Sequence, residues 1–304
     1  MPEIKTSQSV GMAGHFTIKK FNSESGEQVG EWDFDNLITN HGLDRIGTSG
    51  DWFDYCYVGS GKDVPAFTDN TLQNQIAVKD NTSDPSYGNS GVSPYYLWLK
   101  KSFQFGEGAA AGNIAEVGIG WSGGSLFSRA LILDELGDPA VITVLPNEFL
   151  TVDYELRIYP KLTDDTGSVT FTGSKGGTYD WIFRSAGVNY PYWGKSNSVP
   201  YFGYATTGGA DSVSPSDIGS VTSQPANLTY LDLSYSSVAS YVPGSYERTF
   251  TRSLSVNQAN FTTGLRSFYF RRGIGKFQIQ FDPAIPKEST DTLSFTYTIK
   301  WGRI

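Results

Sequence analysis

The sequence predicts an all-β protein made of two tandem antiparallel β-sandwich units, with very little helix. Residues 149–159 and 293–301 carry most of this prediction, because apolar and polar residues alternate along both segments. Alternation with a period of two indicates a strand with one buried face and one exposed face. Similar short segments recur along the chain with glycine turns between them, which is typical of sandwiches and barrels.

The same two segments indicate an internal duplication. Tyr154 and Tyr297 lie 143 residues apart within matching alternations, and both side chains are expected to point inward. Further upstream, Ile114 lies 151 residues before Leu265. Any two strands alternate, so a chance alignment is the alternative, but several segments keep the same order. We therefore expect one antiparallel unit to occur twice.

The predicted organisation has four parts. They are an N-terminal arm at 1–13, a β-sandwich domain at 14–160, a linker at 161–167 and a second β-sandwich domain at 168–304. The arm is expected because its residues are mostly small and polar. The linker is expected because residues 160–167 combine a proline, a glycine and several polar residues.

The first unit is expected to begin with a hairpin. Alternating residues at 16–21 and 29–34 flank a turn at 24–26, and a short helix near Gly42 should follow. Alternation and apolar runs then predict strands at 52–58, 95–105, 114–121, 126–133, 141–145 and 149–159. Residues 80–92 are rich in Asn, Ser, Gly, Asp and Pro, so we expect an exposed loop there.

The second unit should contain a similar series of strands. They are expected at 169–171, 179–184, 201–206, 228–233, 247–256, 265–271, 277–281 and 293–301. Long polar loops at 187–199 and 207–226 separate some of these strands. Loops of this length tend to be functional or to contact partners.

Composition excludes several classes of protein. Aromatic residues make up 14% of the chain and charged residues 18%, and the net charge is −8. A negative surface repels phosphate, so no nucleic-acid partner is expected. The single Cys56 cannot form an intrachain disulfide or a cysteine metal cluster. No apolar run is long enough to span a membrane, and the first residues do not resemble a signal peptide.

Motifs for cofactor, metal or nucleophile chemistry are missing from the sequence. His15 and His41 have no partner at metal-ligand spacing, and there is no GxSxG motif. The turn at 59–62 (GSGK) lacks the spacing of a phosphate loop, so it is interpreted as a surface turn. We therefore expect no enzyme activity, no cofactor and no metal site.

Carboxylate pairs leave open one catalytic alternative, a glycoside hydrolase. Such pairs can assemble across strands without any local sequence signature. Asp51, Asp54 and Glu116 are candidates, but the sequence does not distinguish among them.

One loop carries residues suited to contact with a partner. Tyr190, Tyr192 and Trp193 lie close together with Asn189 and Lys195. Aromatic faces beside amide donors are typical of sugar sites, where rings stack on C–H faces. The preferred interpretation is that these rings pack against their own sheet or a neighbouring subunit.

Two stretches resemble a known family. The first is Asn36–Asp44 (NLITNHGLD) with the following YVGSG turn at 57–61, and the second is 114–120 (IAEVGIG) with 126–130 and 150–157. Together they resemble the virion structural proteins of tailed bacteriophages, a group that includes tail, tail-fibre and minor structural proteins. The resemblance covers roughly residues 30 to 160 and implies no catalytic residues.

The resemblance implies a non-enzymatic component of a phage particle, assembled in the bacterial host cytoplasm. The leading expectation is a tail or fibre-attachment protein that docks on the virion and carries or contacts a fibre or adhesin. Its partners would be copies of itself, with a trimer favoured, and other virion proteins. A module that binds host-surface carbohydrate is the first alternative, and a capsid decoration or collar protein is the second.

Overall fold

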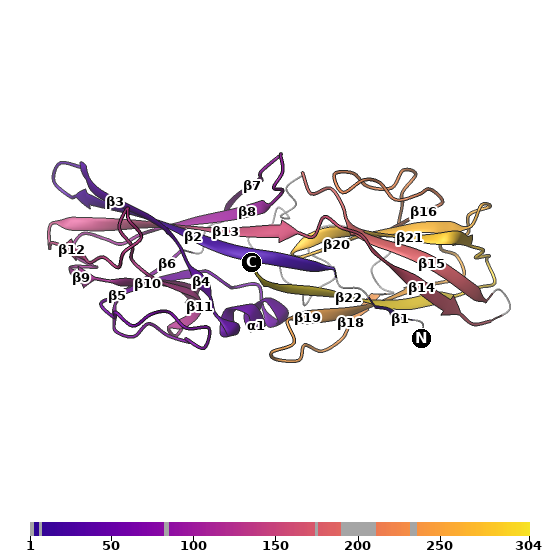
Figure 1. Ribbon diagram of the computed structural model, residues 1–304, viewed down its shortest axis with the longest axis horizontal. Helices are drawn as coiled ribbons and strands as arrows, with labels where there is room; N and C mark the ends of the chain where they lie inside the picture. The colour runs from indigo at the N-terminus through magenta and orange to yellow at the C-terminus, as the bar shows by residue number, and fades with distance from the viewer. Residues whose placement is uncertain (1–2, 6–7, 82–84, 174–175, 190–210, 232–235) are drawn as a thin grey trace.

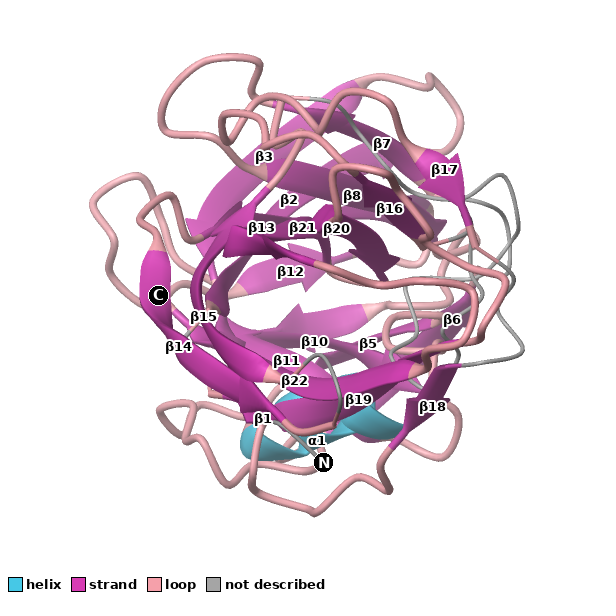
Figure 2. Cartoon of the chain, turned by 90° about the vertical axis from the view of Figure 1, so that its right-hand side faces the viewer, coloured by secondary structure: helices cyan, strands magenta, loops and turns pink. Residues whose placement is uncertain are grey.

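The computed structural model describes residues 3–5, 8–81, 85–173, 176–189, 211–231 and 236–304. It confirms the all-β class, because the described residues contain many strands and one helix. The chain forms two lobes that lie end to end along the long axis of the molecule (Figure 1). Seen along that axis, the strands lie in two facing layers (Figure 2).

The N-lobe is a sandwich of two antiparallel sheets. Across its first sheet the order is β3 (Gln28–Asp35), β2 (Ser9–Asn22), β13 (Glu148–Pro160), β8 (Leu97–Gln104) and β7 (Ser86–Asn89). Across its second sheet the order is β4 (Leu37–Ile38), β11 (Ser125–Leu131), β10 (Glu116–Trp121), β5 (Tyr55–Gly59) and β6 (Gln75–Asp80). A two-stranded ribbon of β9 (Gly112–Ile114) and β12 (Ile142–Val144) and the helix α1 (Asn40–Thr48) complete the lobe.

The C-lobe is a second sandwich. Its first layer contains β1 (Glu3–Ile4), β22 (Leu293–Arg303), β19 (Glu247–Leu254) and β18 (Ser236–Val238). Its second layer contains, in order, β14 (Asp165–Phe171), β15 (Gly177–Ser185), β21 (Gly275–Ile285), β20 (Leu265–Arg272), β16 (Ser212–Ser214) and β17 (Thr229–Tyr230).

The two lobes repeat the same strand order. Eight strands of the N-lobe have counterparts in the C-lobe with the same neighbours and the same place along the chain. The pairs are β4 and β15, β5 and β16, β6 and β17, β7 and β18, β8 and β19, β10 and β20, β11 and β21, and β13 and β22. Equivalent residues also pair with each other in both lobes, because Ile114 pairs with Ile142 as Leu265 pairs with Ile285.

Tyr154 and Tyr297 both point inward, as predicted. Their exposed fractions are 0% and 1%. Their strands nevertheless pair with a small difference in register. Leu99 lies opposite Leu156, whereas its counterpart Phe250 lies opposite Tyr297. The difference is two residues, and a shift of two leaves the same side chains on the buried face.

The N-terminal segment does not form the predicted arm. Strand β2 begins at Ser9, and Val10 and Met12 are buried. β1 pairs with β22 in the C-lobe, so the chain starts in one lobe and then crosses into the other. As a result β22, β2 and β13 are neighbours in one nine-stranded sheet that runs through both lobes.

Two shorter predictions also need correction. β14 begins at Asp165, so the predicted linker at 161–167 is partly a strand. β7 lies within the expected loop at 80–92, where it pairs with β8. In both places most residues are polar or small, so no alternation of apolar and polar residues marks the short strand.

Candidate functional site

The predicted contact residues belong to the loop at 187–199. Tyr190, Tyr192 and Trp193 lie outside the described residues. Other described residues form the candidate site, and they include the stretch Asn36–Asp44, the turn at 57–61 and the residues at 114–120 and 126–130.

The glycine turn after β5 binds a carboxylate of the protein itself. Glu116 is fully buried, and its Oε1 accepts hydrogen bonds from the backbone nitrogens of Gly61 at 3.0 Å and Asn74 at 2.8 Å. Its Oε2 accepts from the backbone nitrogen of Gln73 at 3.1 Å. A Cβ at Gly61 would overlap Glu116 Oε1, so a glycine is required there. The turn is therefore not a phosphate loop. The sequence predicted a surface turn, but this turn contacts a fully buried side chain.

Arg129 completes this buried group. Its Nε donates to Glu116 Oε2 at 2.9 Å, and its Nη1 donates to Asp69 Oδ2 at 2.7 Å. Its Nη2 donates to the backbone oxygen of Asp63 at 3.0 Å. Apart from the contact between Glu116 and Arg129, these hydrogen bonds connect β10 and β11 to the loop between β5 and β6. The function of this group is to fix that loop, because a buried carboxylate with this many donors has no free position for a ligand.

The other half of the first motif forms the start of α1. Thr39 caps the helix, because its Oγ1 accepts from the backbone nitrogen of Gly42 at 2.8 Å. The same hydroxyl donates to the backbone oxygen of Leu126 at 2.9 Å. A Cβ at Gly42 would overlap the backbone oxygen of Phe127, so glycine allows α1 to lie directly on β11. The threonine and glycine of this motif therefore position the helix.

The helix in turn holds the end of the chain. Trp301 Nε1 donates to the backbone oxygen of Leu43 at 2.9 Å. Arg303 Nη2 donates to Asn40 Oδ1 at 2.7 Å. Asp44 Oδ1 accepts from the hydroxyl of Tyr241 at 2.6 Å. Because Tyr241, Trp301 and Arg303 belong to the C-lobe, the Asn36–Asp44 motif is part of the contact between the lobes.

Strand pairing makes the rest of this contact, which we call the joint. Val10 of β2 lies between Pro160 of β13 and Trp301 of β22. Just before β2, the buried Gln8 donates through Nε2 to the backbone oxygens of Thr163 at 2.9 Å and Phe183 at 3.0 Å. The joint is therefore built from main-chain hydrogen bonds as well as side chains.

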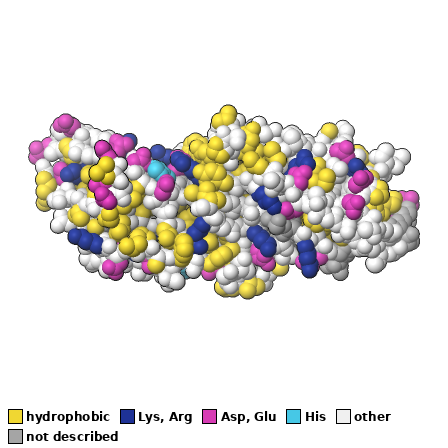
Figure 3. Space-filling model, in the orientation of Figure 1, with side chains coloured by type: hydrophobic (Ala, Val, Ile, Leu, Met, Phe, Trp, Pro, Cys, Tyr) yellow, Lys and Arg dark blue, Asp and Glu magenta, His cyan; other side chains and the backbone are white. Residues whose placement is uncertain are grey.

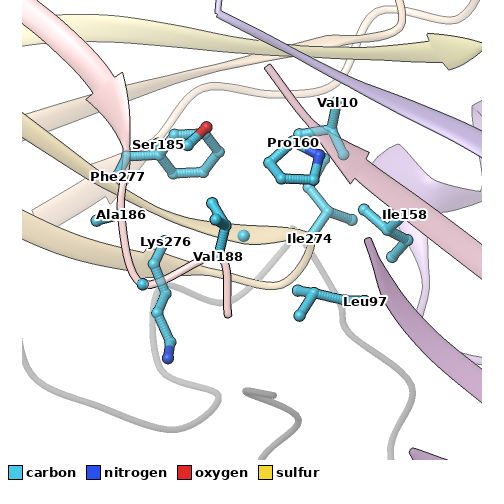
Figure 4. Close-up of a pocket in the computed structure, with 12 residues that line it drawn as sticks. Val10, Leu97, Ile158, Pro160, Ser185, Ala186, Val188, Ile274, Lys276 and Phe277 are labelled. Atoms are coloured by element: carbon cyan, nitrogen blue, oxygen red, sulfur yellow. The ribbon is translucent and has the colours of Figure 1, made fainter. Parts of the chain in front are cut away.

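A small apolar cavity of about 20 Å³ lies at the joint (Figure 4). Both lobes line it: the N-lobe contributes Leu97 and Ile158, and the C-lobe contributes Ile274 and Phe277. The Lys276 stem also lines it, with the ammonium pointing away from the apolar side chains. Burial, reinforced by Arg271, lowers the pKa of Lys276 to about 8. A cavity this small holds about one water and offers no space for a substrate.

Each lobe also encloses an ion pair. In the C-lobe, Asp211 accepts from Arg272 at 2.8 Å and 3.0 Å, and Arg252 lies 3.8 Å from the same carboxylate. In the N-lobe, Lys101 donates to Asp54. Lys101 and Arg252 lie 151 residues apart, so they are counterparts in the repeat.

The carboxylates proposed for hydrolysis are all engaged by cations. Asp51 pairs with Arg45, Asp54 with Lys101 and Glu116 with Arg129. His15 lies between Asp33 and Asp35, and His41 packs edge-on against Trp121. Within the described part of the chain, no three His, Cys, Asp or Glu residues are arranged to hold a metal ion. None of its helices is long and apolar enough to cross a membrane.

Comparison of the chain with family models, with curated proteins and with solved structures finds no match in any of the three.

Proposed function

We propose that this protein is a non-enzymatic structural component of a tailed-phage particle, which docks on the virion and carries or contacts a fibre or adhesin. The joint is the observation that carries the proposal. A strand hydrogen-bonded between the last strands of two sandwiches couples the lobes into a single stiff rod. A rod of this kind transmits position and force between its two ends, which is what a part that connects a particle to a fibre requires.

The N-lobe tip is the end that we assign to the particle. Leu136 is 86% exposed in the turn before β12, and Val141 and Leu145 flank that strand with half of their surface exposed. Hydrophobic side chains also gather on the visible face of the N-lobe and near the joint (Figure 3). Exposed apolar residues that cluster indicate a contact surface, since isolated ones need no explanation. Self-association and docking on other virion proteins both need such a surface.

Mass spectrometry of purified virions would test the assignment to a particle. The proposal expects the chain among the structural proteins at a fixed copy number. Finding it only in the soluble fraction of infected cells, or in a cellular enzyme complex, would contradict the proposal.

Light scattering of the purified chain would test whether the N-lobe tip takes part in self-association. We expect a homo-oligomer, with a trimer favoured, that Leu136→Glu weakens. Tyr230→Glu is the control, because Tyr230 is 69% exposed on the edge strand β17 of the C-lobe. Equal weakening by both variants would show that the tip has no special role in assembly.

A further inference from the structure

Two loops meet through a lysine and an asparagine at the C-lobe tip, the end of the molecule opposite to the N-lobe tip (Figure 1). The loop between β19 and β20 contains Asn260, and the loop between β21 and β22 contains Lys287. Nζ of Lys287 donates to Oδ1 of Asn260 at 2.9 Å. An amine and a carboxamide from separate loops are therefore in direct contact.

The lysine amine is fixed in position and largely removed from water. Lys287 is 3% exposed, although its neighbours Pro286 and Glu288 are exposed. Nζ also donates to the backbone oxygen of Glu288 at 3.4 Å. Burial lowers the pKa of Lys287, and the Asp291 carboxylate opposes part of this effect. The amine is therefore neutral more often than that of a lysine in water, and the neutral amine is the nucleophilic form.

The carboxamide of Asn260 is fixed at both of its polar atoms. Oδ1 accepts from Lys287, and Nδ2 donates to the backbone oxygen of Val256 at 2.7 Å. Because Cγ is bonded to Oδ1, a hydrogen bond to Oδ1 places the lysine nitrogen close to the carbonyl carbon. Holding a nucleophile beside its target removes much of the entropic barrier to a reaction between them.

Two carboxylates belong to the same loop as the lysine. Oδ2 of Asp291 accepts from the backbone nitrogen of Glu288 at 2.9 Å, so its charge is held in the turn that follows Lys287. The exposed Glu288 lines the same groove as Asn260 and Lys287. A carboxylate beside an amine and an amide can carry a proton from one to the other. The tip therefore combines a nucleophile, a carbonyl carbon and a group for proton transfer.

We propose that Lys287 and Asn260 join in an intramolecular isopeptide bond. The neutral Nζ attacks Cγ of Asn260, the bond between Cγ and Nδ2 breaks, and Nδ2 leaves as ammonia with a proton from Nζ. Glu288 transfers that proton. One amide replaces another, so the step needs no oxidant or reductant, and the escape of ammonia makes it irreversible. The bond fastens the two loops to each other. This modification goes beyond the structural role proposed above and does not rest on it.

Intact-mass spectrometry of the full chain would test the proposal. Incubation at about pH 9 favours the neutral amine. We then expect a mass that is lower than the sequence mass by one ammonia, and digestion should release a branched peptide that contains both Asn260 and Lys287. A chain that keeps its full sequence mass would overturn the proposal. So would an ammonia loss that fragmentation places at another residue.

Variants identify the two partners. Asn260→Ala removes the carboxamide from an exposed position, and Lys287→Arg keeps the charge and a donor but is not nucleophilic, because a guanidinium stays protonated. Both should keep their full sequence mass. Lys276→Met is the matched control, since burial also lowers the pKa of Lys276, and this variant should lose ammonia as the unmodified sequence does. Ammonia loss in either of the first two variants, or none in folded Lys276→Met, would contradict the assignment.

A third variant tests the proton transfer. Glu288→Gln changes an exposed side chain and should slow the loss of ammonia by at least about tenfold. The measurement is the fraction of freshly purified chain that has lost ammonia at successive times. An equal rate in this variant would show that Glu288 does not carry the proton.

Discussion

The two lobes share a strand order but bury their charges to different depths. In the N-lobe, Glu116 and Arg129 fix a loop at the edge of the sandwich, and Lys101 pairs with the partly exposed Asp54. In the C-lobe, Arg272 and Asp211 are both buried. Arg272 also lies 4.8 Å from the ring centre of Phe250 and 5.6 Å from that of Tyr297.

The difference shows which features of the repeat are constrained. Alternation along the strands decides which side chains face the core, and the two lobes agree on it. The identity of each buried charge depends on its partner, which lies on another strand and can change with it. A buried ion pair is weak support for stability, yet losing one partner leaves an uncompensated charge. The lobes should therefore respond alike to core truncation and differently to loss of an acid.

The largest effect should come from the two equivalent tyrosines. Tyr154→Ala and Tyr297→Ala should each lower the free energy of unfolding by about 3–5 kcal/mol, as for other large core aromatics. Urea unfolding followed by fluorescence measures this. A loss below about 1 kcal/mol in either variant would mean that the lobes do not bury this residue equivalently.

Removing the acidic residue of the ion pair should destabilise the C-lobe more than the N-lobe. Asp211→Ala leaves Arg272 without its carboxylate partner and should cost about 3–5 kcal/mol. Asp54→Ala should cost only about 1–3 kcal/mol, because Lys101 keeps its hydrogen bond to the backbone oxygen of Asn81. Equal costs in urea unfolding would contradict the distinction between a deep ion pair and a peripheral one.

The joint should be sensitive to a single side chain of α1. Asp44→Ala removes the acceptor of Tyr241 and of the backbone nitrogen of Gly244, and should cost about 1–3 kcal/mol. Asp33→Ala serves as the control, since its side chain is 60% exposed and its loss should cost about 0.5 kcal/mol or less. Differential scanning calorimetry of both variants distinguishes the two sites.

The smallest effect should be a pH dependence of the free energy of unfolding that is due to Lys276. Its pKa is about 8 in the folded chain and about 10.4 in an unfolded one, so the unfolded state binds more protons between these values. Stability should therefore rise with pH above about 8, and the rise should be smaller in Lys276→Met. Measurements up to about pH 9.5 avoid most tyrosine ionisation in the unfolded state. An identical pH profile for both proteins would show that Lys276 is not held in an apolar setting.

Local patterns predicted much of the fold. The strands at 149–159 and 293–301, the first hairpin and the short helix near Gly42 are all present, because each has a clear periodicity or turn signal. The N-terminal strand was missed, although Val10 and Met12 continue the alternation that begins at Phe16. Glycine and alanine at positions 11, 13 and 14 make that alternation hard to recognise.

The candidate sites were less predictable. Asp211 and Arg272 are 61 residues apart, and the contact of Trp301 with Leu43 spans 258 residues. Such pairs follow from sheet topology, which single-strand patterns do not determine.

Hydrogen exchange at the joint tests the central claim, that the two lobes form one stiff body. Amides of residues 10–12 in β2 lie between β13 and β22, so they should exchange as slowly as those of the β13 core at 150–158. Mass spectrometry of peptides from both segments compares them within one sample. Equal protection is the predicted result. Exchange at residues 10–12 that is orders of magnitude faster would show that the joint opens while the lobes stay folded, and would contradict the account.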